Sequence, residues 1–347
     1  MKRAKIKNKY NMLENVVKLV KKHPKISDFH LRAGCAFSYR LLGEIQSISE
    51  DIIKKEQIEE ILNKFCSKKD VEHFIAKNEL DSGFTFENIR FRANFYKTLN
   101  GPALVLRKVD TTIFTMEDLN LPPAMFSIVD MHKGLVLVTG PTGSGKSTTL
   151  AAIINQINET RNCNIITIED PVEFIHKDKK SIISQREVGK QTESFTTALK
   201  SALREDPDVI LVGELRDIET IGMALTAAET GHLVFGTLHT SGAPNTINRI
   251  IDVFPHEQQT QIQAQLAESL QMVVTQKLFK TIDGESRVGA FEIMVCNAPI
   301  KNLIREKKIH QIPSIMQTGQ RDGMITIEKS IENLVNSGKI NPIDAKE

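Results

Sequence analysis

The spacing of hydrophobic and polar positions changes near residue 110. Before that point, short runs with strand-like alternation prevail, and helical periodicity interrupts them at about residues 11–22 and 55–66. The strand-like runs read "DFHLRAG", "FSYRLLGEI", "FTFENIRFRANFY" and "ALVLRKV". A mixture of strands and helices over this length predicts a small N-terminal α+β domain at residues 1–110.

A segment with two adjacent prolines separates this region from the rest of the chain. It reads "DTTIFTMEDLNLPPAMF", and Pro122 and Pro123 disfavour continuous regular structure there. The sequence therefore predicts a linker at residues 111–120 and a second domain at residues 121–347.

From Gly134 onward, apolar β-rich runs alternate with helical segments. The runs are short, rich in valine and isoleucine, and apolar on both faces, as in a parallel sheet that helices cover on both sides. They read "GLVLVTG", "NIITIED", "DVILVGE" and "HLVFGTLH", and the helices are expected to begin near Lys146, Ser194, Ile218 and Ala243. This alternation predicts a doubly wound, three-layer α/β domain that binds ligands at the carboxyl ends of its strands. A polar, mostly helical subdomain is expected at about residues 297–347.

Composition indicates a globular protein without a strong charge. The chain has 347 residues, of which 40% are hydrophobic and 25% charged, and its formal net charge is +2. This length favours two domains, and the balanced charge gives no electrostatic reason to expect nucleic-acid binding. The four cysteines lack the paired spacing of a zinc site or of a disulfide framework. Since no apolar run approaches the roughly 20 residues that span a bilayer, we expect a cytoplasmic protein that meets any membrane through partners.

The segment "GPTGSGKS" matches the phosphate-binding P-loop pattern GxxxxGK[ST] in full. An apolar strand precedes it and a helix follows it, which is the context that this motif requires. The glycines let the backbone turn its N–H groups toward phosphates, Lys146 places a positive charge against the β- and γ-phosphates, and Ser147 offers a hydroxyl to Mg²⁺. The sequence therefore predicts a site for ATP and Mg²⁺. Its residues are Gly140, Pro141, Thr142, Gly143, Ser144, Gly145, Lys146, Ser147 and Thr148.

Acidic residues end two of the predicted strands. Glu214 ends the apolar run in "PDVILVGELRD", the position of a Walker B carboxylate that holds the magnesium shell or orients the attacking water. Glu169 ends "NIITIED". A lone glutamate at a strand end is usually a solvated cap, but two beside one P-loop indicate a magnesium-dependent hydrolase. His239 ends the fourth run and His232 begins it; the spacing fits a histidine that senses the γ-phosphate and equally one satisfied within the core.

These elements, in this order, resemble the secretion-ATPase superfamily of type II secretion and type IV pilus motors. The P-loop is followed by an Asp box at Ile166–Glu173, a Walker B strand at Val209–Glu214 and a His box at Gly231–His239. The segment "ISDFHLRAG", Ile26 to Gly34, resembles the N-terminal signature of that family. The resemblance implies a C-terminal RecA-like P-loop NTPase domain and a smaller, PAS-like N-terminal α+β domain.

Within this superfamily, the chain is most similar to the ATPases that retract type IV pili. It is short, it lacks the cysteine-rich zinc element that extension and secretion ATPases insert after the His box, and it carries "PIKNLIRE" at Pro299–Glu306. Retraction ATPases have a C-terminal signature of this kind. The same octapeptide also fits an ordinary amphipathic helix, with Ile300, Leu303 and Ile304 on one face.

The resemblance to retraction ATPases implies a function and partners. It implies an ATP-hydrolysing homohexameric ring that works with an inner-membrane platform protein, retracts pili and supports twitching motility. It also implies that arginines of the N-terminal domain reach the nucleotide of a neighbouring subunit. The matching segment, "IRFRANFYKTLNGPALVLRKV", offers Arg92 and Arg107, with Arg90 as a further candidate. A solvated strand face is the alternative interpretation of these arginines.

Three other functions remain open on the sequence alone. The first is a pilus-extension or type II secretion ATPase. The second is a nucleic-acid translocase, which would need a basic channel with aromatic residues, whereas this chain has no tryptophan and three tyrosines. The third is a regulatory module whose P-loop senses nucleotide without hydrolysing it.

Overall fold

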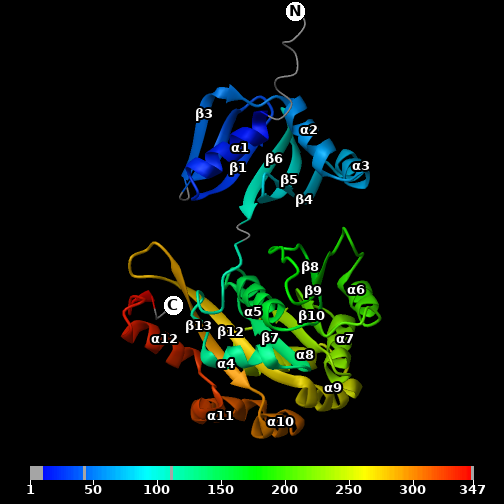
Figure 1. The fold of residues 1–347 in the computed structure, drawn as a ribbon, viewed down its shortest axis with the longest axis vertical. Helices are drawn as coiled ribbons and strands as arrows, with labels where there is room; N and C mark the ends of the chain where they lie inside the picture. The colour runs from blue at the N-terminus through cyan, green and yellow to red at the C-terminus, as the bar shows by residue number, and fades with distance from the viewer. Residues whose placement is uncertain (1–10, 42–43, 110–111, 345–347) are drawn as a thin grey trace, which may run out of the picture. The chain divides into compact units, whose positions relative to one another are not determined.

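The computed structural model describes residues 11–41, 44–109 and 112–344 (Figure 1). The chain divides into two compact units, Met1–Thr111 and Thr112–Glu347. Residues 110 and 111, where the sequence predicts the boundary between domain and linker, lie outside the described residues. None of the helices in the described ranges is long and apolar enough to cross a lipid bilayer.

The first unit is built on one antiparallel sheet of six strands in the order β3-β2-β1-β6-β5-β4. Its elements are α1 (Asn11–Lys22), β1 (Ile26–Arg32), β2 (Ala36–Leu41), β3 (Glu44–Ile52), α2 (Lys55–Phe65), α3 (Lys68–Lys77), β4 (Glu79–Phe86), β5 (Ile89–Thr98) and β6 (Gly101–Val109). The third predicted run, "FTFENIRFRANFY", is a hairpin of β4 and β5, because Glu87 and Asn88 adopt left-handed φ angles of 45° and 66° and turn the chain back. The helix α3 was not predicted, although Ser67 and Asp70 form a capping box at its start.

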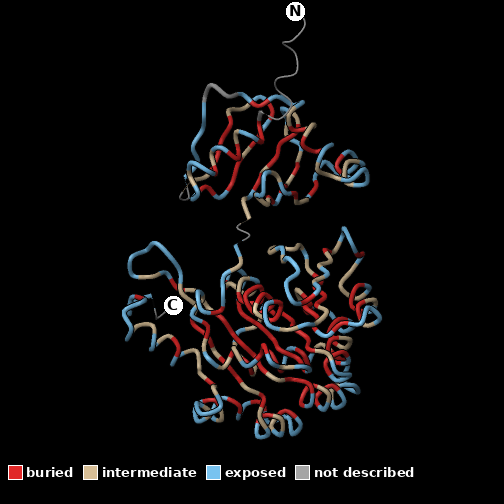
Figure 2. The backbone as a smooth tube through the Cα atoms, in the orientation of Figure 1, coloured by how far each residue is buried: buried red, intermediate tan, exposed pale blue. Residues whose placement is uncertain are grey.

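Buried residues alternate with more exposed ones along several strands of this sheet, so its two faces differ in character (Figure 2). One face is apolar and packs against α1, α2 and α3 to form the core of the unit. Its members include Phe29, Leu31, Phe37, Phe91, Phe95, Leu104 and Leu106. Side chains alternate between the faces of a strand, so Asp28, Arg92 and Arg107 lie on the opposite, polar face. The sheet therefore presents the candidate arginines on the side away from its helices.

The second unit contains a seven-stranded sheet in the order β13-β12-β7-β11-β10-β8-β9. Adjacent strands are parallel except for the antiparallel pair β12 and β13. Its strands are β7 (Gly134–Thr139), β8 (Asn164–Glu169), β9 (Ile182–Glu187), β10 (Val209–Val212), β11 (Leu233–Leu238), β12 (Leu270–Lys280) and β13 (Arg287–Val295). Its helices are α4 (Pro123–Phe126), α5 (Lys146–Thr160), α6 (Phe195–Ala202), α7 (Ile218–Glu229), α8 (Ala243–Asp252), α9 (His256–Ser269), α10 (Ala298–Arg305), α11 (Ile312–Thr318) and α12 (Ile327–Asn336). The four predicted strands are β7, β8, β10 and β11, adjacent strands of this sheet.

Helices cover both faces of this sheet, which gives three layers (Figure 1). Alternate residues of β7 show the division: Leu135 and Leu137 pack with α7 and α8, whereas Val136 and Val138 pack with α5. Strands that are buried on both faces read as continuous apolar runs, which is why the sequence identified them. The layered α/β architecture expected for this region is confirmed.

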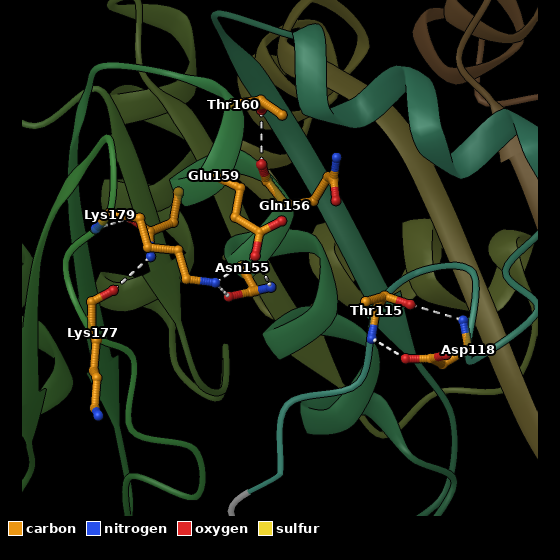
Figure 3. Close-up of polar contacts among 9 residues, drawn as sticks. Thr115, Asp118, Asn155, Gln156, Glu159, Thr160, Lys177 and Lys179 are labelled. Atoms are coloured by element: carbon orange, nitrogen blue, oxygen red, sulfur yellow. Dashed lines mark hydrogen bonds and ion pairs between the residues drawn. The ribbon is translucent and has the colours of Figure 1, made fainter.

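Residues before the first strand of the second unit also fold onto it. Met116 and Leu121 are buried in the same cluster as Ile128, beside α5. Thr115 and Asp118 hydrogen-bond reciprocally, since each backbone N–H donates to the side-chain oxygen of the other, at 3.0 Å in both cases (Figure 3). Part of the segment predicted as a linker thus belongs to the packed second unit.

The helix α5 also holds the loop that leaves β8. Asn158, which is fully buried, donates to the carbonyl of Lys177 at 2.8 Å and accepts from the backbone N–H of Lys179 at 3.0 Å. The Lys179 ammonium contacts Asn155 at 2.8 Å and Glu159 at 2.5 Å (Figure 3). These contacts fix a loop that carries the second half of the predicted Asp box.

Candidate nucleotide-binding and catalytic site

The P-loop, Gly140 to Ser147, connects the end of β7 to the start of α5. Gly140 and Gly145 have φ angles of 136° and 89°, a region that residues with a β-carbon rarely adopt. The sequence requires glycine at these positions because the chain must turn sharply from strand to helix. Pro141, Thr142, Gly143 and Ser147 are exposed on the loop, Gly145, Lys146 and Thr148 are half-buried, and Ser144 is buried.

Lys146 lies across the loop in this structure. Its ammonium donates to the carbonyl oxygens of Gly140, at 2.8 Å, and Pro141, at 3.1 Å. Burial lowers the pKa of Lys146, and the carboxylates of Glu214 and Glu173 act in the opposite direction. A cation, two carboxylates and the loop backbone therefore lie at one end of the sheet.

Two features of the loop fit a bound polyphosphate. The hydroxyl of Ser144 is buried and has no hydrogen-bond partner among the residues that the structure describes, so it is available to a ligand. The helix α5 begins at Lys146 and directs its unpaired N-terminal N–H groups and the positive end of its dipole at the loop. The residues present thus match the chemistry of the phosphates of a nucleotide.

Glu214 follows β10 and lies between two basic side chains. One carboxylate oxygen contacts Arg216 at 2.7 Å and the other lies 3.5 Å from Nε2 of His239. The hydrogen bond from Arg216 lowers the pKa of Glu214 and outweighs its partial burial. Glu214 is therefore an ionised carboxylate at neutral pH, and the structure brings it together with His239.

His232 lies at the other end of β11 from His239. Its Nδ1 is 2.9 Å from the carbonyl oxygen of Ala227, in the last turn of α7. The ring thus lies against the end of a helix, so the structure separates the two histidines of the predicted His box.

Glu169 ends β8 in a more enclosed environment than Glu214. Its carboxylate accepts a hydrogen bond from the Thr167 hydroxyl at 2.6 Å and one from the Gln185 amide at 3.3 Å. Burial raises the pKa of Glu169 in spite of these hydrogen bonds. A small cavity of about 40 Å³ is lined by Glu169 together with Ser147 and His176. The structure therefore brings the P-loop hydroxyl and this carboxylate to one cavity.

These oxygen groups fit Mg²⁺ held mainly by a nucleotide. The described residues contain no group of three or more His, Cys, Asp or Glu side chains that could hold a metal ion by themselves. Magnesium at phosphate-transfer sites takes one or two protein ligands and completes its shell with phosphate oxygens and water. Ser147, with a carboxylate close by, provides such a partial shell, and the cavity has room for water.

Glu173 is a candidate that we did not single out from the sequence. Its carboxylate acts on the pKa of Lys146 together with Glu214, and its backbone N–H hydrogen-bonds to Glu169. It lies in the loop that α5 holds through Asn158. The local sequence marked it solely by its place at the end of the Asp box. A loop has no regular period, so the pattern of its residues does not predict toward which part of the site an acidic side chain points.

The candidate arginines belong to the first unit. Arg107 donates from Nε to Asp28 at 2.7 Å, and the two residues lie opposite each other on β6 and β1. On β5, the other neighbour of β6, Arg92 lies opposite Arg107, so both side chains lie on one face of the sheet. Arg90 is two residues before Arg92 on β5 and therefore lies on the same face. The side chain of Arg107 is 66% exposed although its Nε is engaged. Burial would raise the pKa of Asp28, but the hydrogen bond from Arg107 prevails and lowers it.

Comparison with known proteins gives consistent matches over most of the chain. A family model described as type II/IV secretion system protein matches residues 78–339. The chain is 50% identical over 315 residues to a twitching motility protein of Neisseria gonorrhoeae, covering 90% of this chain and 84% of that protein. It is 46% identical over 322 residues to the type IV pilus retraction ATPase PilT of Pseudomonas aeruginosa, covering 92% and 93%. The crystal structure of the pilus retraction motor PilT with bound ADP superposes with a TM-score of 0.89 at 42% identity, covering 96% of this chain and 95% of that one.

Proposed function

This chain belongs to the family of type II/IV secretion system proteins, and on that premise we propose that it is an ATPase that drives retraction of type IV pili. The observation that carries the proposal is a complete P-loop with Glu214 and His239 at the same end of the sheet, in a chain that resembles a retraction ATPase over nearly its whole length. The likeness to a retraction motor with bound ADP supports nucleotide binding.

In this proposal each P-loop residue has a defined task. The phosphates of ATP lie on residues 140–148, where backbone N–H groups and the Ser144 hydroxyl donate to them. Lys146 leaves the loop carbonyls and places its charge against the β- and γ-phosphates. Ser147 and Glu214 would hold Mg²⁺, partly through water, and that ion would neutralise phosphate charge that develops during hydrolysis.

Glu214, Glu169 and Glu173, together with His239, have separate roles in hydrolysis in this proposal. Glu214 orients the water that attacks the γ-phosphate, because it is ionised and held by Arg216. His239 lies against Glu214 and is proposed to contact the γ-phosphate end of the nucleotide. Glu169 assists beside Ser147, and Glu173 adds a second charge near Lys146.

The assembly and partners are also part of the proposal. The second unit is a RecA-like P-loop NTPase domain, and the first is a PAS-like domain whose polar sheet face carries Arg92 and Arg107. Six chains form a ring in which these arginines act on the ATP of a neighbouring subunit, where a positive charge supplied across an interface accelerates phosphoryl transfer. The ring works in the cytoplasm against the platform protein of the pilus machinery at the inner membrane.

The C-terminal signature needs a restricted interpretation in this proposal. Ile300 and Ile304 are fully buried in the main core of the second unit, so the apolar face of α10 serves folding. Pro299, Asn302, Arg305 and Glu306 are exposed, so a partner can contact them. Substitutions at these exposed positions, rather than removal of the helix, are suited to testing its role in retraction.

Replacing Glu173 with glutamine should lower kcat for ATP hydrolysis by about tenfold, because its carboxylate contributes a fixed charge beside Lys146, which meets the phosphates. Replacing Glu169 with glutamine should cost less, because the Glu169 carboxylate already accepts hydrogen bonds from Thr167 and Gln185. Steady-state phosphate release measures both effects, and Glu193→Gln, at an exposed position, is the matched control. The reverse order of the two effects would assign the main role to Glu169.

Deleting the gene in its own organism tests the direction of the motor. We expect cells with surplus surface pili and no twitching motility, because assembled pili would no longer be withdrawn. Counting pili by electron microscopy and measuring twitching zones provides the result. The wild-type gene should restore motility and a Glu214→Gln gene should not. Bare cells would indicate an extension motor and would contradict the proposal.

A further inference from the structure

The strand beside the P-loop strand carries a buried polar residue that the roles above do not use. Gln276 lies in the second half of β12 and is only 3% exposed. It follows Thr275, which is opposite Thr139 on β7, and the hydroxyls of these two threonines are 2.9 Å apart. Gln276 therefore lies beside the start of the P-loop, where β7 ends.

Gln276 contacts both ends of the P-loop. At the first glycine, a β-carbon added to Gly140 would lie 2.4 Å from the backbone carbonyl oxygen of Gln276. At the last glycine, a β-carbon added to Gly145 would lie 2.7 Å from the side-chain amide nitrogen of Gln276. The loop therefore passes close to this one residue at both ends: the Gln276 backbone excludes a β-carbon at Gly140, and at Gly145 the amide of Gln276 lies against a glycine that the positive φ of 89° also favours.

The other end of the Gln276 amide is fixed to the helix that follows the loop. Its side-chain oxygen accepts a hydrogen bond from the Thr149 hydroxyl at 2.8 Å, and Thr149 is 1% exposed. Both groups are buried, so loss of either leaves the other without a partner and costs more than an exposed hydrogen bond would. One side chain thus joins β12, the last turn of the loop and the first turn of α5.

We infer that Gln276 is a positioning residue for the phosphate loop, and that it holds the loop in the shape that receives the phosphates of a nucleotide. The inference rests on the proposed function, because it assumes that the loop binds ATP. Gln276 does not touch the phosphates in this role. Because it fixes Gly145 and Thr149 relative to Gly140, the backbone N–H groups between them are already arranged before the ligand arrives.

The hairpin of β12 and β13 gives this residue a rigid support. Phe291 lies opposite Gln276 on β13, and its backbone N–H donates to the Ser330 hydroxyl of α12 at 2.9 Å. Residues 277–280 then continue β12 and, with residues 141–144, line a cavity of about 500 Å³. The strand therefore forms one wall beside the loop, and Gln276 is its buried contact with the loop.

The test compares Gln276→Met and Gln276→Ala with the wild-type chain. Methionine fills the space but cannot accept the hydrogen bond, so it keeps the core packed. We expect both variants to bind a fluorescent ADP analogue about tenfold more weakly and to raise KM for ATP by a similar factor, while kcat changes by less than about threefold. Thermal unfolding without nucleotide should show that Gln276→Met still unfolds cooperatively, at a somewhat lower midpoint because the buried Thr149 hydroxyl loses its acceptor.

Two controls separate the outcomes. Gln271→Ala changes a glutamine on the same strand that contacts Gly134, at the opposite end of β7, and should leave ADP affinity unchanged. Thr149→Val should weaken binding as Gln276→Met does, and the double variant should bind no more weakly than either single one. Wild-type affinity in Gln276→Met, or additive losses in the double variant, would overturn the inference. A wild-type chain that binds no ADP would instead overturn the proposed function.

Discussion

Replacing Glu214 with glutamine is expected to lower the rate of ATP hydrolysis by at least about a hundredfold and to leave nucleotide affinity within about threefold of the wild type. Glutamine has the same shape but cannot carry the negative charge that orients or activates water. The native carboxylate carries this charge at neutral pH, and the hydrogen bond from Arg216 lowers the pKa of Glu214 further. Phosphate release over time and equilibrium binding of a fluorescent ADP analogue measure the two effects.

The fold should tolerate this substitution. The Arg216 side chain is 64% exposed, so water can replace its lost partner at little cost, and the ion pair contributes little to stability. Glu219→Gln, at an exposed position in the first turn of α7, is the matched control and should hydrolyse ATP like the wild type. Normal turnover by Glu214→Gln would remove Glu214 from its proposed role and leave Glu169 or Glu173 as the essential carboxylate.

The strands at the centre of the second unit could be predicted from the sequence for a physical reason. The strands β7, β8, β10 and β11 are buried on both faces, so each is a short apolar run bounded by polar residues. The strand β12 was not predicted, because it follows α9 directly, with Ser269 ending the helix and Leu270 beginning the strand. The strand β9, "IISQRE", is a half-exposed edge strand whose weak alternation resembles that of a loop.

Some residues of the site could be predicted from the sequence and others could not. The P-loop could be predicted because its chemistry restricts residue type at fixed spacing: glycine where φ is positive and lysine where a charge must meet phosphate. The contacts of Gln276 could not, because it lies 127 residues beyond its partner Thr149 and no local pattern marks it. Pairing over distance also changes Arg107, which the sequence presents as a free side chain and which the structure joins to Asp28, 79 residues earlier.

Replacing Lys146 with methionine is expected to weaken the binding of both ATP and ADP by about a hundredfold and to abolish measurable turnover at ordinary ATP concentrations. Methionine keeps the length of the side chain but loses the charge that meets the phosphates. Among the residues that the structure describes, the Lys146 ammonium donates to the carbonyl oxygens of Gly140 and Pro141. Because burial lowers the pKa of Lys146, phosphates in the loop would stabilise a charge that the protein alone holds at a cost.

Thermal unfolding with and without nucleotide measures this prediction on the whole chain. At a ligand concentration a hundred times the wild-type Kd, binding stabilises the wild-type protein by about 2.7 kcal/mol, and a variant that binds a hundredfold more weakly gains only about 0.4 kcal/mol. The matched control is Lys200→Met, an exposed lysine of α6, which should keep the full nucleotide-induced shift. A full shift in Lys146→Met would mean that backbone N–H groups and the α5 dipole hold the nucleotide by themselves. The loss expected here follows instead from a site in which Lys146, together with Arg216, offsets the repulsion between the phosphates and the two nearby carboxylates, Glu214 and Glu173.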